Sequence, residues 1–376
     1  MNAPLLPGRC LWFAAPHAVE RTRDAVASLL KKTLLSAVEF MDCVEHGNDV
    51  LDRRFHLNVV NCVEHESTPR GETLAAVENL LTNFGWVMTV GEMLMPIVGA
   101  MRRELLAATY IQADGTPVDV QTHDRRGKNH QAYLWQYGTP GASTVFDFRL
   151  GRGREGPARF LDNFEGILQT DGYVAYDRGV GGTRMVHAAC WSHARRQFVD
   201  AIKLNKLDTA SIGIVELMDK LFAIDARARD EKMNHAARHA LRQQEAPPLL
   251  EKIREQILAM SRNVLPKSAA GKACIYTLTL WKRLEHFLDY PELELSNNLA
   301  ENSMRGVALG RKNWRHIGSQ QAGPKVAAIL SVVEDCRRIG LPIREYLAAV
   351  LPGLDNRSIH SLEQLTPAGY AASKLK

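Results

Sequence analysis

The feature that most constrains the fold is a block of short β-branched and aromatic runs between residues 110 and 189. The runs occupy residues 110–114, 132–137, 144–148, 166–170 and 185–189, and Gly, Pro or charged residues separate them. Such runs between turn residues predict strands. A helical pattern at about 156–164 lies between the third run and the fourth, so the block predicts a three-stranded meander that continues into alternating helices and strands.

Three consecutive strands, then helix, strand, helix and strand, is the order of a ribonuclease-H-like mixed sheet, and we expect this α/β fold. Amphipathic helical spacing surrounds the block. It predicts helices at 24–41 and 86–108, an almost wholly helical stretch at 192–262 that Pro247 and Pro248 interrupt, and helices at 273–289, 299–305 and 322–339. We interpret residues 192–272 as a helical insertion.

A chain of 376 residues is long enough for two domains, or for one large domain with an insertion. We expect a mostly helical N-terminal segment at 1–84, a ribonuclease-H-like domain at 85–351 and a C-terminal tail at 352–376. The Pro, Gly and Ser residues of the tail predict a loose structure. Residues 42–83 have a mixed pattern without a chemical motif.

Positive charge is concentrated in the C-terminal half. Residues 185–272 carry 15 basic and 10 acidic side chains, and residues 301–376 carry 11 and 6, so each stretch has a net charge of +5. An anionic partner such as DNA fits this half, although a merely solvated basic surface has the same composition.

Six cysteines, none in a Cys-x-x-Cys pair, argue against a disulfide framework and a four-cysteine zinc site. No run approaches the roughly 18 apolar residues that a membrane span needs, and the N-terminus lacks a signal-peptide pattern. We therefore expect a cytoplasmic protein with reduced thiols and no membrane partner.

Two aspartates end predicted strands, Asp114 in IQADGTPVDV and Asp171 in ILQTDGYVAYD. Acids at the ends of neighbouring strands can converge on a hard cation, because Mg²⁺ prefers carboxylate oxygens. Glu301 is the best third acid, since it begins a predicted helix after a polar turn.

Each of these acids also has a purely structural interpretation. An Asp before a Gly at the end of a strand is most often a turn residue, which applies to Asp114 and Asp171 alike. Asn298 followed three residues later by Glu301 resembles a capping box, in which the glutamate only satisfies the start of a helix. Spacing alone leaves both interpretations open.

A resemblance to a known family supports a functional role for the three acids together. The chain between about 85 and 365 contains, in order, IQADGTPVDV, QAYLWQYG, ARFLDNFEGILQTDGYVAYD, HAACWSHARRQF, LSNNLAENSMRGVALGRKNWRHIGS and AAILSVVEDCRRIGLPIREYLAAVLPG. In these stretches it resembles the catalytic part of bacterial insertion-sequence-66-type transposases, which are DDE enzymes with a ribonuclease-H-like fold. The resemblance implies that Asp114, Asp171 and Glu301 are a catalytic, metal-binding triad.

The resemblance also implies an activity, namely DNA strand cleavage and strand transfer at transposon ends. It implies two Mg²⁺ ions on the triad, with Mn²⁺ as a substitute. It further implies a homo-oligomer on DNA, accessory proteins of the element and a nucleoid-associated place in the cytoplasm. A helical insertion before the last acid is expected of the family.

The sequence departs from the family pattern at several points. Gly115 stands where the family usually has Glu, Ser296 where it commonly has Asp, and Asn302 where it usually has Arg. Full-length relatives carry N-terminal DNA-binding segments with a cysteine-rich, zinc-binding part, whereas residues 1–84 match none of the family pattern, which predicts a truncated or frameshifted copy. Two alternatives therefore stay open, an inactive DNA-binding remnant and a host nuclease of the same fold.

The run CysTrpSerHis at 190–193 has two interpretations. A Cys-x-x-His pair can supply half of a zinc site, but four ligands are needed and no second pair with suitable spacing is evident. The favoured interpretation places Cys190 and Trp191 in the core at the end of a strand, and His193 at the start of the next helix, near the triad.

Basic side chains close to the triad acids in sequence are candidates for DNA contact. Cations around an aromatic residue such as Trp314 suit a DNA backbone, although Trp314 itself is expected to anchor its loop in the core. Arg195 and Arg196 have two interpretations: they contact DNA phosphates, or they belong to a solvated face of a helix. The candidates are Arg195, Arg196, Arg311, Lys312 and Arg315.

Overall fold

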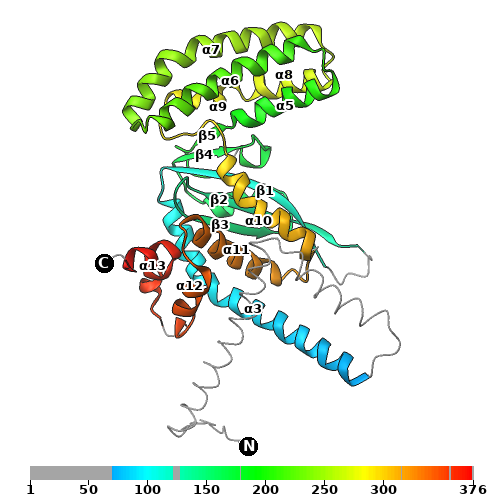
Figure 1. The fold of residues 1–376 in the computed structure, drawn as a ribbon, viewed down its shortest axis with the longest axis vertical. Coiled ribbons are helices and arrows are strands. Elements are labelled where there is room, and N and C mark those ends of the chain that lie inside the picture. The colour runs from blue at the N-terminus through cyan, green and yellow to red at the C-terminus, as the bar shows by residue number, and fades with distance from the viewer. Residues whose placement is uncertain (1–69, 122–127, 178, 315, 355–356, 375–376) are drawn as a thin grey trace, which may run out of the picture. The chain divides into compact units, whose positions relative to one another are not determined.

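The computed structural model describes residues 70–376 apart from 122–127, 178, 315, 355–356 and 375–376 (Figure 1). The helix expected at 24–41 lies outside the described residues. The chain divides into two compact units, Met1–Thr89 with Pro342–Arg357, and Val90–Leu341 with Ser358–Lys376. The sheet and the candidate site lie wholly within the second unit.

The described strands form one mixed sheet in the order β3-β2-β1-β4-β5, with the short β6 pairing β1 (Figure 1). β2 runs antiparallel to β1 and β3, whereas β1, β4 and β5 are parallel, as are β1 and β6. The strands are β1 (Tyr110–Val120), β2 (His130–Gly138), β3 (Thr144–Arg149), β4 (Ile167–Thr170), β5 (Val186–Ala189) and β6 (His316–Ile317). The prediction of an α/β fold with a mixed sheet is confirmed.

β1 is longer than the sequence predicts. It continues past Asp114 to Val120, because β2 pairs with it from Gln112 to Val120. Pro117 is tolerated inside it, since residues 113–118 pair with β2 alone and a proline is accepted where a strand lacks a neighbour on one side. The prediction that Asp114 ends the strand is therefore wrong.

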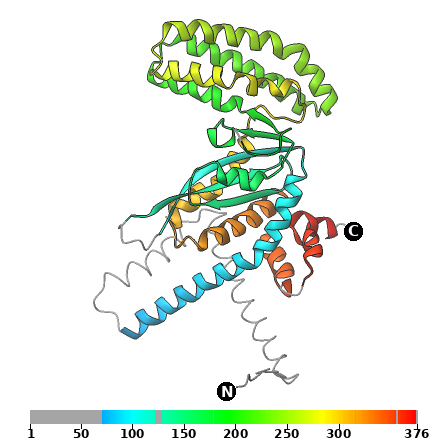
Figure 2. The same ribbon diagram turned by 180° about the vertical axis from the view of Figure 1, so that it is seen from behind.

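Helices cover both faces of this sheet (Figures 1 and 2). One face carries Asp114, Gln136 and Phe146 in a row, and α10 and α11 pack on it. On the other face Phe160 of α4 stacks on Tyr137 of β2, with ring centroids 3.8 Å apart. The helices around the sheet are α3 (Arg70–Leu106), α4 (Glu155–Leu161), η1 (Val174–Tyr176), α10 (Asn298–Trp314), α11 (Ala322–Arg338), η4 (Ile359–Leu365) and α13 (Pro367–Lys374).

α11 also covers the outer edge of β3. The backbone N–H groups of Thr144 and Phe146 donate to Asp335 Oδ1 at 2.9 Å and to Ser331 Oγ at 2.8 Å. An edge strand otherwise presents unpaired N–H groups, so these side chains replace a missing neighbour strand. Gly323 lets the helix come this close, because a Cβ there would lie 2.2 Å from the Phe148 ring.

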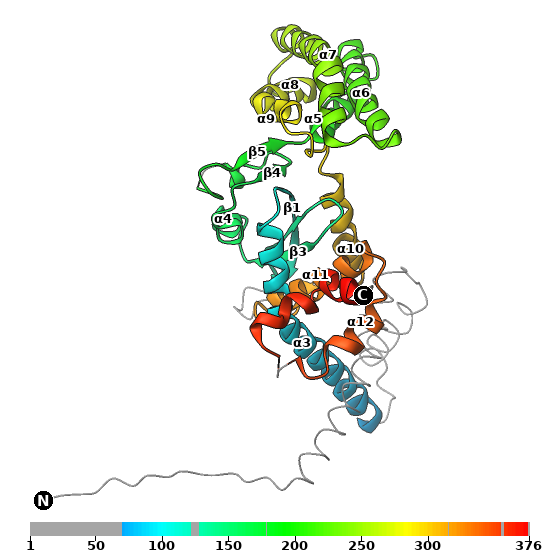
Figure 3. The same cartoon turned by 90° about the vertical axis from the view of Figure 1, so that its left-hand side faces the viewer.

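The helical insertion is a bundle beyond the β5 edge of the sheet (Figure 3). It shares one apolar core with Tyr110 of β1, Ile167 of β4 and Ala188 of β5. Side chains of Asp208, Asn234 and Ser268 cap the starts of three of its helices. The bundle comprises α5 (Trp191–Leu204), α6 (Thr209–Asp230), α7 (His235–Asn263), α8 (Ala269–Thr279), α9 (Trp281–Glu285) and the 3-10 turn η2 (His286–Leu288).

Pro247 and Pro248 do not interrupt this bundle, so the predicted break is wrong. Both lie inside α7 on its exposed side. The neighbouring Ala246 and Leu250 are buried in the core of the bundle. Tertiary packing of the apolar face therefore outweighs the hydrogen bonds that the two prolines cannot make.

Other element boundaries also differ from the predictions. α3 begins at Arg70, within the stretch that has a mixed sequence pattern, and α10 continues past residue 305 to Trp314. The tail is not loose, since η4 and α13 form there and the Thr366 hydroxyl donates to Glu104 Oε1 at 3.2 Å.

α12 (Ile343–Val350) belongs to the first unit. No helix among the described residues is long and apolar enough to cross a membrane.

A buried ion cluster ties the bundle to the chain segment that leads into α10. Asp225 of α6, with its side chain 2% exposed, accepts from Arg238 at 2.7 Å and from Arg242 at 2.7 Å. Arg242 also donates to the backbone carbonyls of Phe287 at 3.0 Å and Leu293 at 2.8 Å. Burial and these two guanidinium groups act in opposite directions on the pKa of Asp225, and the net pKa lies below its usual value.

Replacing Asp225 by Ala should destabilise the protein by about 3–5 kcal/mol, because two buried guanidinium groups would lose their counter-charge. Urea unfolding measures the change. Asp219→Ala is the control, since its ion pair with Arg195 is half exposed and should contribute less than about 1 kcal/mol. Equal losses in the two variants would contradict this account.

Candidate functional site

Two of the three candidate acids occupy equivalent positions on neighbouring segments, Asp114 within β1 and Asp171 directly after the end of β4. The last pairs between β1 and β4 are Ile111 with Leu168 and Gln112 with Gln169. Asp114 and Asp171 each come two residues later, so both side chains leave the sheet at the same level and on the same face. Neighbouring strands lie about 4.8 Å apart, and the charge of Asp171 contributes to the raised pKa of Asp114, so the two carboxylates are close in space.

Asp114 is partly buried, and its surroundings disfavour its charge. Burial raises the pKa of Asp114 to about 6, and the negative charges of Asp171 and Glu301 contribute to the rise. The backbone N–H of Gly115 donates to Asp114 Oδ1 at 2.8 Å and acts in the opposite direction. The three carboxylates are thus close enough for their charges to interact.

Asp171 is fixed by the turn that follows β4. Its Oδ1 accepts from the backbone N–H of Tyr173 at 2.9 Å, and its carbonyl accepts from the Tyr276 hydroxyl. Gly172 has a φ of +87°, which favours glycine, and a Cβ there would lie 2.5 Å from Leu280. The turn interpretation of Asp171 is therefore correct, and it leaves one carboxylate oxygen without a described bond to the turn.

Buried glutamines hold the chain before α10 against these strands. Gln112 Nε2 donates to the carbonyl of Ser296 at 2.9 Å, and Gln169 Nε2 donates to that of Glu294 at 2.7 Å. The backbone N–H of Ala300 donates to Gln112 Oε1 at 3.3 Å. The first turn of α10 is thereby held on the face of the sheet that carries Asp114 and Asp171.

Glu301 lies in that first turn and contacts the helical insertion. Its Oε2 accepts from Arg196 Nη2 at 3.1 Å, and its Oε1 lies 3.3 Å from His193 Nε2. Burial lowers the pKa of His193, while the charge of Glu301 raises it. The capping interpretation predicts a bond to the start of α10, but the described contacts of this side chain are with α5.

The three acids do not form a closed metal cage as they stand. Among the described residues, no group of three or more His, Cys, Asp or Glu side chains is arranged to hold a metal ion. Two observations nevertheless fit a hard divalent cation. The donors are carboxylate oxygens, and the buried Glu301 Oε1 forms no hydrogen bond among the described residues apart from its ion-pair contact with His193 Nε2 at 3.3 Å.

Cys190 and Trp191 are core residues, as the favoured interpretation predicts. Both are at most 1% exposed, and burial raises the pKa of the Cys190 thiol to about 11. Trp191 Nε1 donates to the carbonyl of Leu284 at 2.9 Å. His193 lies in the first turn of α5, next to Glu301.

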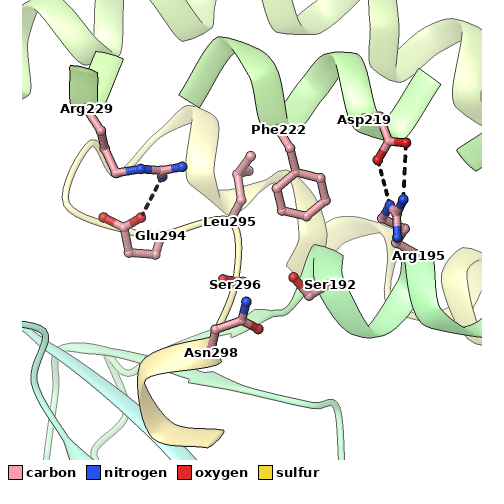
Figure 4. Close-up of a pocket in the computed structure, with 9 residues that line it drawn as sticks. All are labelled: Ser192, Arg195, Asp219, Phe222, Arg229, Glu294, Leu295, Ser296 and Asn298. Atoms are coloured by element: carbon pink, nitrogen blue, oxygen red, sulfur yellow. Dashed lines mark hydrogen bonds and ion pairs between the residues drawn. The ribbon is translucent and has the colours of Figure 1, made fainter. Parts of the chain in front are cut away.

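A pocket of about 290 Å³ opens between α5, α6 and the start of α10 (Figure 4). Phe222 and Leu295 form its apolar part. Its two arginines are compensated, since Arg195 pairs with Asp219 at 2.6 Å and Arg229 with Glu294 at 3.5 Å. The polar remainder consists of Ser192, Ser296 and Asn298.

The predicted DNA contacts have different surroundings. Arg195 and Arg196 are both ion-paired, with Asp219 and Glu301. Arg311 and Lys312 lie in α10 rather than in a loop. Arg315 and the side chain of Trp314 lie outside the described part of the chain.

Gln112 and Gln169 have roles that were not predicted from the sequence. The signal is present in the sequence, because each candidate aspartate stands two residues after a glutamine, in GlnAlaAsp at 112–114 and GlnThrAsp at 169–171. A glutamine and an aspartate at this spacing share one face of a strand.

Comparisons with known proteins identify one matching family and several similar proteins. The family model described as Transposase IS66 family matches residues 78–325. The uncharacterized protein y4jD of Sinorhizobium fredii is 33% identical over 236 residues, which cover 61% of this chain and 46% of that protein. The uncharacterized protein y4hP of the same organism is 28% identical over 298 residues, 73% of this chain and 53% of that protein. The chain spans about half the length of these relatives. No solved structure matches it significantly.

In metal-free protein, Asp114→Asn should stabilise the fold at pH 8, and the gain should shrink at pH 5. The pKa of Asp114 is about 6 when folded and about 3.9 when unfolded, so ionisation costs folded-state stability as the pH rises through this window. Asparagine carries no charge and keeps an oxygen for the Gly115 N–H. Urea midpoints in EDTA at both pH values measure the effect. A variant less stable than wild type at pH 8 would refute it.

Proposed function

The chain belongs to the IS66 family of transposases, and from this premise we propose that it cleaves and joins DNA strands at the ends of a mobile element. The family supports a transposase-type role with DNA as substrate. The observation that carries the finer proposal is the equivalent placement of Asp114 and Asp171, each two residues beyond the last paired residues of β1 and β4, with Glu301 close enough to influence the pKa of Asp114.

The proposed fold is ribonuclease-H-like, over a catalytic domain at 85–351 with the helical insertion at 192–272. The strand order β3-β2-β1-β4-β5, with β2 antiparallel to its neighbours, supports this proposal. The insertion precedes Glu301 in the sequence, as the family pattern requires. Residues 1–84 and 352–376 remain outside this proposed domain.

Asp114, Asp171 and Glu301 would hold the divalent metal, Mg²⁺ with Mn²⁺ as a substitute. Bound there, two such ions would supply an activated attacking oxygen and a stabilised leaving oxygen. The chain's own contribution is orientation. The N–H groups of Gly115 and Tyr173 each fix one oxygen of an aspartate at 2.8 and 2.9 Å. Arg196 and His193 hold the carboxylate of Glu301 near the strands.

DNA contact is proposed for the basic side chains that the sequence singles out. Arg311, Lys312 and Arg315 stand at or just beyond the end of α10, the helix that carries Glu301. Arg195 and Arg196 are also proposed to contact DNA. Asp219 compensates part of the charge of Arg195, and Glu301 compensates part of the charge of Arg196. A homo-oligomer on DNA, accessory proteins of the element and nucleoid association complete the proposal.

A second candidate is a DNA-binding member of the family that does not cleave strands. One observation favours it, since Glu301 is engaged by α5 and the described residues hold no ready metal cluster. The two candidates differ in whether Glu301 leaves its partners when a metal ion is present. Metal-dependent cleavage therefore decides between them.

Asp114→Asn, Asp171→Asn and Glu301→Gln should each reduce Mg²⁺-dependent cleavage by at least about a hundredfold, some 2.7 kcal/mol of transition-state stabilisation. DNA binding should persist, because these side chains carry no positive charge. The assay is nicking of a supercoiled plasmid that carries the DNA flanking the coding sequence, with Mg²⁺ or Mn²⁺.

The matched control is Asp200→Asn, an exposed carboxylate on α5 that pairs with Lys203. It should cleave like wild type. Undiminished cleavage by the Asp171 variant would exclude the triad mechanism. Binding without cleavage by the wild-type protein would support the second candidate.

A further inference from the structure

Arg152 is held between two tyrosine rings in the loop after β3. Its guanidinium carbon lies 4.0 Å from the ring centroid of Tyr173 and 5.6 Å from that of Tyr133. The Tyr173 hydroxyl donates to the backbone carbonyl of Arg152 at 3.2 Å, so main chain and side chain are both fixed. A guanidinium stacked on aromatic faces keeps its N–H groups directed outward along its edge.

This arginine differs from several arginines around the candidate site that are paired with a carboxylate. Arg196 is paired with Glu301, Arg283 with Asp177 at 2.7 Å, and Arg149 with Asp147 at 2.6 Å. Figure 4 shows the same compensation for Arg195 and Arg229 in the pocket. Arg152 is exposed, and within the described parts of the chain no carboxylate forms an ion pair with it. Its full charge is therefore open to an anion.

Arg152 is linked to Asp171 through Tyr173. Tyr173, on which it stacks, is the residue whose N–H holds Asp171 Oδ1. Two exposed apolar side chains lie close to Arg152 and Tyr173 in the sequence. They are Leu150, which is 39% exposed, and Val174, which is 64% exposed. A cation on an aromatic ring with apolar neighbours is the chemistry that binds a nucleotide of a single strand, phosphate on the cation and base or sugar on the apolar surface.

We propose that Arg152, held by Tyr173 and Tyr133, binds a backbone phosphate of the DNA strand next to Asp171. The inference rests on the proposed function and names a contact of that same site that the sequence did not predict. Three neighbouring carboxylates repel a polyanion, and an uncompensated, preoriented guanidinium beside them offsets this repulsion. Arg152 is thereby a binding residue rather than a catalytic one.

The test is fluorescence anisotropy of a labelled single-stranded oligonucleotide titrated with the full chain in EDTA, over a series of NaCl concentrations. Arg152→Ala should weaken binding about three- to tenfold and reduce the slope of log K against log salt by about 0.7, the value for one phosphate contact on a single strand. Arg152→Lys keeps the charge but not the planar stack, so its slope should stay near wild type while its affinity falls less.

Arg184→Ala is the matched control, an exposed arginine that pairs with Glu165 at 2.9 Å. It should leave affinity and slope unchanged. Wild-type affinity and slope in Arg152→Ala, or equal losses in both variants, would overturn the inference while the proposed function stands. A wild-type chain that binds no oligonucleotide would also overturn the inference, whereas the proposed function depends on the metal-dependent cleavage assay. Far-UV circular dichroism checks that each variant is folded.

Discussion

The hydrogen bonds of two buried glutamines are the interaction on which the rest of the site depends. Gln112 and Gln169 are each at most 1% exposed, and a buried amide without partners would be costly. Their partners include backbone groups at residues 294, 296 and 300, more than a hundred residues further along the chain. Satisfying the glutamines therefore fixes where the chain returns from the helical insertion and where α10 begins.

The insertion holds the same returning segment from its other side. Arg242 donates to the carbonyls of Phe287 and Leu293, and Arg238 pairs with Glu294 at 3.0 Å. Asp225 compensates both arginines inside the bundle. The segment before α10 is thus bound to strands on one side and to helices on the other, which gives the bundle a structural part in positioning Glu301.

Electrostatics around the three carboxylates distinguish two kinds of cation. Most arginines near the site are compensated by a carboxylate, and Arg196 shares its charge with Glu301 itself. A compensated arginine fixes structure but attracts a polyanion weakly. The proposed DNA contact at Arg152 follows from this distinction, which a count of basic residues along the sequence does not contain.

Sequence patterns predicted the strands well, because period-two runs between turn residues are a local property. The runs at 132–137 and 144–148 lie wholly in strands, and those at 166–170 and 185–189 do so except for their first residue. His193 lies in the first turn of a helix beside Glu301. Patterns failed where packing decided the outcome. Pro247 and Pro248 stay inside α7 because its other face is buried, and β1 runs past Gly115 because β2 pairs with it.

The sequence by itself determined the alternation of strands and helices, the family, and the carboxylates that stand at equal spacing after two glutamines. Tertiary structure alone decided which groups meet. The contact between Arg196 and Glu301 joins residues 105 positions apart, and the level of Asp114 with Asp171 depends on the register of two strands. Register and helix packing follow from burial of apolar faces against distant partners, so no local pattern encodes them.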